Sequence, residues 1–573
     1  MKAGAKLALV VVTLGLLYWP GIQHHWATAR DRYFAPFDAA QYIPAFFKFD
    51  PNDPIPTTYA KEYYLNAVCP LLYKWSIIAG AQFFDVRGFQ LGMMYLAYAV
   101  FLGTMGRLGW LLGGATLSFA VVALTFTAWI FFGLGFIGAA PRMYAYPLMA
   151  LILFALIRDR PYLLALTVIL GGLLYPIVAL IGGCCLAGWL LVSPLCRHGR
   201  VSRWRLSRRL ALVALTGFLT SAALAPLVLG ASSYGRRVVE ADISKYPEAG
   251  PDGNYRSYDQ LPYKLVGSEW TIYFAGPMYS HGDPIVQQLN VHQNFTGTDL
   301  LLFFAITGLI ALTVILCGMR LIIKDSVGMA MRLIGFFVVC GILHIVAWLA
   351  APYLYIPTRY FMFSLPFLLT FIFPWSLSLL LRRVPQLQSS PRICAAILLG
   401  IISVYLIAFG GRGNVDFSNA VVEKPVRPLF DAIAALPKNS LIAGWPLGPL
   451  RKLEYVTRRN VFLSGDLHQV LHLNFMQAMR ERMDAMFDAY LSADEAPLRR
   501  LRQDFGVTHL IVETRDFTDP IHAPEYFAPW RSRIHPRLAE IKDKEYLLKG
   551  TIHRQAAIFD HDGLILLDLA KLP

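Results

Sequence analysis

Charged residues are scarce in this sequence. Asp, Glu, Lys and Arg make up only 16% of its 573 residues, whereas 56% are hydrophobic and the mean hydropathy is +0.48. This composition excludes an ordinary soluble enzyme, whose surface needs more charge. The seven cysteines contain no CxxC pair and none follows Cys394, so neither a disulfide framework nor a thiolate zinc motif is supported. HExxH, Walker and nucleophile-elbow motifs are also absent from the sequence.

Hydrophobic runs, each about 20 residues long, fill the first 410 residues. Hydrocarbon offers no hydrogen-bond partners, so each run must satisfy its backbone groups internally, as a transmembrane helix does. The sequence therefore predicts an α-helical polytopic membrane protein with about eleven transmembrane helices. The expected spans are residues 7–20, 88–106, 109–132, 143–157, 161–175, 176–195, 210–230, 299–318, 333–351, 360–381 and 393–409.

The basic residues orient these helices. The net charge is +15, but the strongly basic short loops, above all Arg197–Arg209, all fall on one side of the expected topology. Cytoplasmic loops carry such an excess. We therefore expect a cytoplasmic N-terminus and exterior loops at 21–86 and 231–297. The expected membrane is a bacterial inner membrane. Because the positive charge is explained by topology, no nucleic-acid partner is expected. An alternative for the first run is a signal peptide cleaved after Ala27–Ala29, although the long polar gap before that point favours a retained helix.

Residues 411–573 change character and predict a soluble α/β domain on the exterior, periplasmic side. Amphipathic helical patterns cover Pro428–Leu436, Leu473–Tyr490 and Ala496–Phe505. Strand patterns cover residues 441–443, 460–463 and 507–512, and a hairpin is expected from residues 556–559 and 564–567 around His561-Asp562-Gly563. Residues 1–410 and 411–573 are thus expected to be two domains.

Two motifs inside the hydrophobic runs are interpreted as structural. Residues 133–138 match GxGxxG, but no strand precedes them, so helix packing or a loop is favoured over a dinucleotide site. His344 lies alone in a span, and with no partner in view it is interpreted as a structural histidine.

The first exterior loop carries acids among aromatic rings. Asp38, Asp53 and Glu62 are candidates because a carboxylate can accept a hydroxyl proton or hold a metal, while rings can stack on sugar faces. The alternative is an interfacial aromatic belt with solvated acids. We expect Asp38 to be catalytic, and Asp53 and Glu62 to bind substrate.

Arginines open two spans on the same exterior side. Arg359 and Tyr360 follow Pro357-Thr358, and Arg142 follows Pro141. A guanidinium at a helix start suits a phosphate at the membrane surface. The alternative is an arginine that snorkels and sets topology, which the positive-inside rule disfavours on this side.

These features together resemble the GT-C glycosyltransferase superfamily. The resemblance covers the architecture of the whole chain and four short matches, namely Phe37–Tyr42, Pro141–Pro147, Tyr175-Pro176 and Pro357–Tyr360. It implies transfer of a sugar from a polyprenyl-phosphate donor on the non-cytoplasmic face, with inversion, to a lipid, glycan or protein acceptor. It also implies that Asp38 acts as catalytic base or metal ligand, with a divalent cation as the candidate cofactor, and that Arg359 contacts the carrier phosphate.

Two other function classes stay open. Many members of the superfamily have adjacent acids at the first-loop site, whereas Ala39 and Ala40 follow Asp38 here. That departure favours a catalytically silent GT-C-like protein, a structural or assembly subunit with partners in a membrane complex. A transporter or flippase is disfavoured because the spans carry few charges and show no inverted repeat.

Overall fold

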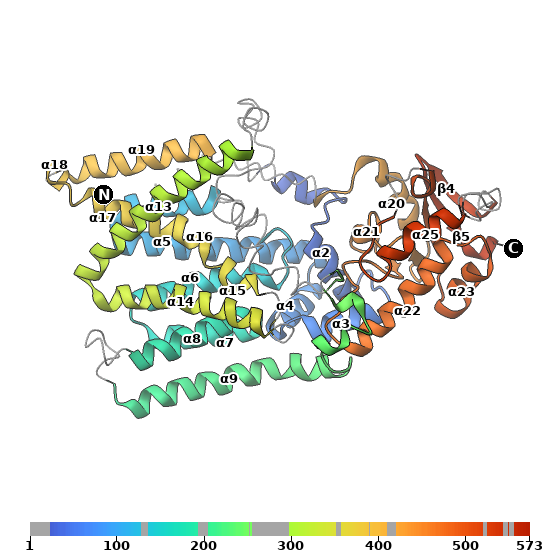
Figure 1. Ribbon diagram of the computed structural model, residues 1–573, viewed down its shortest axis with the longest axis horizontal. Helices are drawn as coiled ribbons and strands as arrows, with labels where there is room; N and C mark the ends of the chain where they lie inside the picture. The colour runs from blue at the N-terminus through green and yellow to red at the C-terminus, as the bar shows by residue number, and fades with distance from the viewer. Residues whose placement is uncertain are drawn as a thin grey trace.

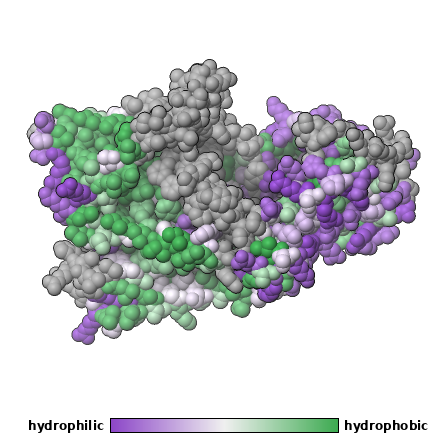
Figure 2. Space-filling view, viewed as in Figure 1, coloured by the Kyte–Doolittle hydropathy of each residue, from purple (hydrophilic) through white to green (hydrophobic). Residues whose placement is uncertain are grey.

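A computed structural model describes residues 23–572, apart from 24, 128–135, 193–203, 251, 255–296, 351–353, 355–356, 389, 410–419, 519–523, 542–547 and 549–554. In Figure 1 a long helical bundle occupies one end of the molecule and a smaller α/β part occupies the other. Figure 2 shows mainly hydrophobic residues on the coloured part of the bundle, with hydrophilic residues at its outer end, and mainly hydrophilic residues on the α/β part. This distribution is typical of a membrane domain joined to a water-exposed one.

The bundle is built from apolar helices, and four segments are long and apolar enough to cross a membrane: residues 86–126, 206–232, 327–349 and 359–381. The expected count of about eleven spans is not confirmed, because several helices are shorter and the run 7–20 lies outside the described residues. The bundle helices are α5 (Val86–Thr127), α6 (Ala145–Ile157), α7 (Pro161–Leu174), α8 (Pro176–Val192), α9 (Leu206–Ser232), α13 (Gly297–Asp325), α14 (Val327–Leu349), α15 (Thr358–Met362), α16 (Leu365–Phe367), α17 (Phe373–Leu381), α18 (Pro385–Gln388) and α19 (Pro391–Phe409).

Helix α5 is a hairpin of two helices, and its turn differs in position from the one expected. The backbone leaves the helical region at Gly114, where φ is +72°, a conformation that glycine adopts without strain. The two arms touch where a Cβ on Gly109 would lie 2.7 Å from the Cα of Ser118. Arg107, expected in the loop, therefore lies inside the first arm. Its long side chain is exposed at that position.

The C-terminal α/β part holds all five strands of the sheet in the described residues: β1 (Leu441–Ala443), β2 (Asn460–Val461), β3 (His509–Glu513), β4 (Ala557–His561) and β5 (Leu564–Asp568). Their order is β2-β1-β3-β5-β4, with the first three parallel and the last two antiparallel additions. Every residue of the central strand β3 is buried, as expected for a strand covered on both faces.

The helices of this part are α20 (Arg427–Ala434), α21 (Leu450–Thr457), α22 (Leu473–Tyr490), α23 (Ala496–Phe505), α24 (Arg515–Thr518) and α25 (Arg531–Ile541). Helix α22 buries Met476, Met479, Met483 and Met486, a spacing of three and four residues that places them on one face. Helix α23 ends at Gly506 with φ +69°, which is the usual left-handed C-terminal cap.

The segment expected to form the first exterior loop lies between the bundle and the α/β part (Figure 1). It contains α2 (Phe37–Tyr42), a 3-10 helix (Ile43–Phe49), α3 (Tyr59–Tyr63), a π-helical turn (Tyr64–Val68) and α4 (Leu71–Ala81). The buried Lys61 ammonium donates to Asn460 Oδ1 at 2.5 Å and lies 3.5 Å from Glu454 Oε1. Such buried polar pairing fixes the orientation of the α/β part on the loop.

Candidate functional site

A cavity of about 660 Å³ lies where the bundle, the first exterior loop and the α/β part meet. Its inner wall is apolar and comes mainly from α8 and α9. The charged residues among its described lining are one carboxylate, Asp38, and three guanidinium groups, Arg142, Arg237 and Arg359. The cavity therefore combines a cationic end with a long apolar wall, and this combination suits an amphipathic anion.

Asp38 lies in the first turn of α2, which begins directly after Pro36. The backbone of Gly138 passes so close that a Cβ there would lie 2.3 Å from the Cβ of Asp38. The Gly138 carbonyl accepts a hydrogen bond from Gln90 Nε2 at 3.0 Å. The next residue, Ala139, has φ +42°, an unfavourable value for alanine that persists only where the surroundings impose it. The second half of the GxGxxG match is thus a tight turn against Asp38, while Gly133 and Gly135 lie outside the described residues.

Arg142 forms an ion pair with Asp38, its Nε facing Oδ2. The Asp38 side chain is 17% exposed and that of Arg142 is 25% exposed, so water screens the pair only partly. Arg142 sits in a 3-10 turn, Pro141–Tyr144, that leads into α6. The segment that opens this span thereby brings a cation to the first-loop acid.

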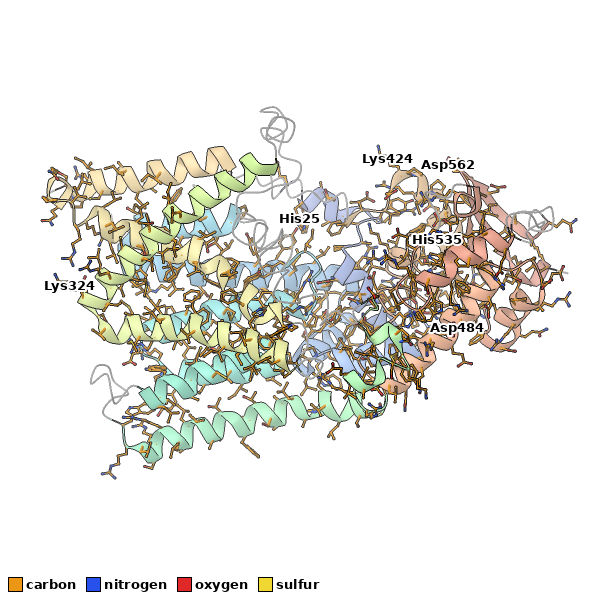
Figure 3. All side chains as sticks on the ribbon, viewed as in Figure 1. His25, Lys324, Lys424, Asp484, His535 and Asp562 are labelled. Atoms are coloured by element: carbon orange, nitrogen blue, oxygen red, sulfur yellow. The ribbon has the colours of Figure 1, made fainter. Side chains whose placement is uncertain are left out.

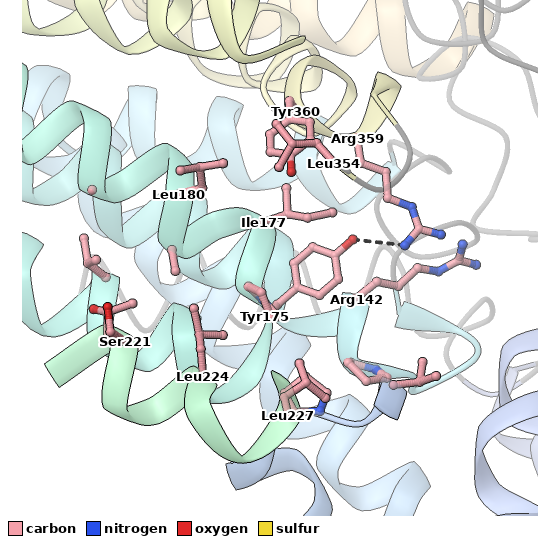
Figure 4. Close-up of a pocket in the computed structure, with 18 of the residues that line it drawn as sticks. Arg142, Tyr175, Ile177, Leu180, Ser221, Leu224, Leu227, Leu354, Arg359 and Tyr360 are labelled. Carbon is pink, nitrogen blue, oxygen red and sulfur yellow. Dashed lines mark hydrogen bonds between the residues drawn. The ribbon is translucent and has the colours of Figure 1, made fainter. Parts of the chain in front are cut away.

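Arg359 reaches the same cavity from α15. Its Nη1 donates to the Tyr175 hydroxyl at 3.3 Å, and Figure 4 shows the guanidinium groups of Arg142 and Arg359 pointing the same way from two separate elements. Because like charges in one cavity repel, an anionic ligand between them would be favourable. Tyr360 is 4% exposed and lines the cavity.

Arg359 lies in the first turn of α15, at the start of the apolar helical segment 359–381. The start of a helix carries a partial positive charge, which adds to that of the guanidinium. His344 bonds the turn that precedes α15, with its Nδ1 2.9 Å from the Pro357 carbonyl oxygen. The interpretation of His344 as structural agrees with this contact, which fixes the turn carrying Arg359.

Sequence patterns did not single out the residues that the α/β part contributes. Gln469 and Leu471 line the cavity, as does Gln41 of α2. Both Gln41 Nε2 and Gln469 Nε2 donate to the Asp466 carbonyl, at 2.6 and 2.7 Å. Arg237 lies beside this segment through a β-bridge to His472. Burial, with Arg237 nearby, lowers the pKa of His472 to about 4.

Asp53 and Glu62, expected to bind substrate, do not line the cavity. Asp53 forms an ion pair with Lys438, and its other oxygen lies 3.1 Å from Arg458 Nη1. Arg458 also pairs with Asp50 at 2.9 Å and Asp85 at 2.6 Å. Asp53 is therefore part of the contact between the first loop and the α/β part. Glu62 lies in α3, whose first turn is capped by Thr58.

The described residues around Asp38 do not fit a divalent cation. No group of three or more His, Cys, Asp or Glu residues that could hold a metal occurs in the described part of the chain. Hard cations take several oxygen ligands, whereas the charged neighbour of Asp38 is a guanidinium. Ala39 and Ala40, which stand where adjacent acids are common in the superfamily, are 0% and 6% exposed and pack into the core.

Neither a protein-family model nor a curated protein sequence matches the chain. Solved structures do. The apo oligosaccharyltransferase of Archaeoglobus fulgidus matches with a TM-score of 0.49 and 11% identity, over 90% of this chain and 70% of that one. ArnT from Cupriavidus metallidurans bound to undecaprenyl phosphate matches with a TM-score of 0.44 and 12% identity, over 99% and 98%. Both are GT-C superfamily enzymes.

The archaeal oligosaccharyltransferase also matches in its complex with an inhibitory peptide and a dolichol-phosphate, with a TM-score of 0.44, 11% identity, and coverage of 89% of this chain and 69% of that one. Identity this low assigns neither a donor nor an acceptor to the present chain. The chemistry of its own cavity has to supply those assignments.

Proposed function

We propose that the protein is a membrane glycosyltransferase of GT-C type that takes a sugar from a polyprenyl-phosphate donor on the non-cytoplasmic face. The observation that carries this proposal is the cavity itself, in which Arg142 and Arg359 stand at one end of an apolar wall formed by α8 and α9. A polyprenyl phosphate has the same two parts, an anionic head and a long hydrocarbon tail. The arginines would bind the phosphate, and the apolar wall would bind the first isoprene units.

The reaction would be a displacement with inversion at the anomeric carbon. The acceptor hydroxyl oxygen forms the new bond to that carbon, the bond from carbon to phosphate oxygen breaks, and polyprenyl phosphate leaves with the electron pair. Guanidinium groups stabilise the negative charge that develops on the leaving phosphate. Asp38 would accept the hydroxyl proton once Arg142 turns from the carboxylate toward the phosphate. The acceptor would be a lipid, a glycan or a protein.

A second candidate function is a silent lipid-binding subunit of a membrane complex. The ion pair between Asp38 and Arg142 favours it, because Arg142 occupies the one acid in the described lining of the cavity, and that lining holds no second carboxylate to accept a hydroxyl proton. In this case the cavity would hold the carrier lipid without transferring its sugar.

Glycolipid and glycan profiles of a deletion strain separate the two candidates. The strain would be complemented with the native protein, with Asp38→Asn or with Arg359→Gln, and the masses of its products would be compared at matched protein levels. The transferase predicts that deletion shifts one product by the mass of a sugar unit and that neither variant restores it. Full rescue by Asp38→Asn together with failure of Arg359→Gln would favour the silent subunit. No change on deletion would contradict the transferase.

A further inference from the structure

A second cavity is lined only by residues of the α/β part and has a volume of about 460 Å³. Gly448, Pro449 and Arg451 line it just after β1, and Glu513 and Thr514 line it at the end of β3. Strand β1 lies between β2 and β3 in the sheet. The chain passes from β1 to β2 on one side, whereas β3 lies on the other side of β1 and leads on to the two antiparallel strands. Open α/β sheets bind ligands in the crevice at the carboxyl ends of strands where the connections diverge in this way.

The charged residues in the lining of this second cavity balance. Its three cations and three acids are Arg451, Lys452, Arg515, Glu423, Glu513 and Asp562. Several are already paired, since Arg515 Nη2 lies 2.6 Å from Glu513 Oε2 and the Lys452 ammonium donates to the Val421 carbonyl at 2.9 Å. An electroneutral wall gives no net attraction for an ion, but it offers many donors and acceptors to a neutral ligand with hydroxyl groups.

A short contact chain joins the two cavities. Arg451, in the wall of the second cavity, binds the Asp466 carboxylate with two hydrogen bonds, from Nε at 2.8 Å and from Nη2 at 2.7 Å. The carbonyl of Asp466 in turn accepts hydrogen bonds from Gln41 and Gln469, which line the first cavity. Asp466 therefore links a lining residue of the second cavity, Arg451, to two lining residues of the first, Gln41 and Gln469.

We propose that this second cavity binds a neutral saccharide, namely sugar residues of the acceptor that lie beyond the unit receiving the transferred sugar. The assignment to an acceptor rests on the proposed transferase function, whereas the saccharide site itself rests on the cavity and its lining. The hydroxyl groups of the sugar would meet the paired charged side chains, and its C–H faces would meet apolar lining residues such as Pro425.

Ligand-observed saturation-transfer NMR on the full-length protein in nanodiscs tests this proposal. The probes are four neutral disaccharides (maltose, cellobiose, lactose and chitobiose) and glycerol phosphate as a charged comparison. The blocking variant is Pro425→Trp, because Pro425 is exposed and lines the cavity. The matched control is Lys424→Trp, at the exposed neighbouring position of the same 3-10 turn. Figure 3 shows Lys424 and Asp562 on the same side of the α/β part.

We expect at least one neutral disaccharide to be saturated, with a signal at least fivefold weaker in Pro425→Trp and unchanged in Lys424→Trp at equal thermal midpoints. Arg515→Ala should weaken it too, with the exposed Arg499→Ala as its control. No saturation of any neutral disaccharide, equal signals in Pro425→Trp, or displacement by glycerol phosphate would overturn the site. Repeating the measurement with Asp38→Asn separates the two proposals, because saccharide binding should persist there even if no sugar transfer occurs.

Discussion

Replacing Gly138 by alanine tests whether the position of Asp38 matters for activity. The added Cβ would lie 2.3 Å from the Cβ of Asp38, and ordinary van der Waals contact begins at 3.4 Å, so the two backbones must separate by up to 1.1 Å (3.4 − 2.3). Gly138 does not have a positive φ, so alanine is excluded there only by this contact.

The expected effect on activity is larger than the effect on folding. Overpacking by one methyl group costs about 1–3 kcal/mol of stability. A misplacement of about 1 Å at a reacting group can reduce the rate roughly 100-fold. We therefore expect Gly138→Ala to lower sugar transfer by about two orders of magnitude while the protein still folds.

The assay compares product formation in the complemented deletion strain with the thermal midpoint of the purified protein. Gly92→Ala is the matched control, since Gly92 lies in α5 with no atom within 4 Å of an added Cβ, and it should retain full activity. Full product formation by Gly138→Ala at an unchanged midpoint would show that the position of Asp38 is not critical, and the catalytic role would be refuted.

Three further substitutions have defined outcomes. Tyr175→Phe removes a hydrogen-bond partner of Arg359 and should weaken polyprenyl phosphate binding roughly fivefold, about 1 kcal/mol, in a lipid titration. Burial lowers the pKa of His468 to about 3, so the stability that its neutral form provides is complete above about pH 6.5 and declines as the pH falls toward 3. Through His468, the native protein should lose roughly 2 kcal/mol of stability between pH 7 and pH 5. His468→Phe cannot be protonated and should not show this part of the loss, as measured by denaturant unfolding. Arg458→Ala leaves three carboxylates without this partner and should cost about 2–3 kcal/mol, against less than about 0.5 kcal/mol for the exposed Arg499→Ala.

Each of these outcomes has a clear opposite. Unchanged lipid affinity in Tyr175→Phe would mean that Arg359 is positioned by other contacts. An acid-unfolding curve of His468→Phe that follows the native one would mean that His468 does not cause the loss of stability at low pH. Equal stability of Arg458→Ala and Arg499→Ala would mean that the loop and the α/β part are held together mainly by apolar packing.

Local patterns allowed much of the fold to be predicted. The amphipathic helices Leu473–Tyr490 and Ala496–Phe505 have the bounds expected from their apolar spacing. The hairpin around Asp562-Gly563 forms β4 and β5. The spans expected after residue 140 correspond to bundle helices. Periodicity works here because each of these elements buries one face or lies wholly in an apolar setting.

The candidate site was predicted only in part. Asp38, Arg142, Arg359 and Tyr360 line one cavity, and their roles stay predictions. Gln469 could not be predicted, because its place depends on a contact between segments more than 400 residues apart. The pairing of Asp53 with Arg458 is equally distant in sequence, so a solvated acid and a paired acid look alike in the sequence.

The central claim is that the cavity lined by Arg142 and Arg359 binds a polyprenyl phosphate through these arginines. Native mass spectrometry of the purified protein, titrated with polyprenyl phosphate and with the matching polyprenol, tests it most directly. A charge-assisted hydrogen bond contributes about 1.5–3 kcal/mol, so we predict that the phosphate binds at least about tenfold more tightly than the alcohol and that Arg359→Gln reduces this preference. Equal binding of the two lipids, or an unchanged preference in Arg359→Gln, would contradict the account.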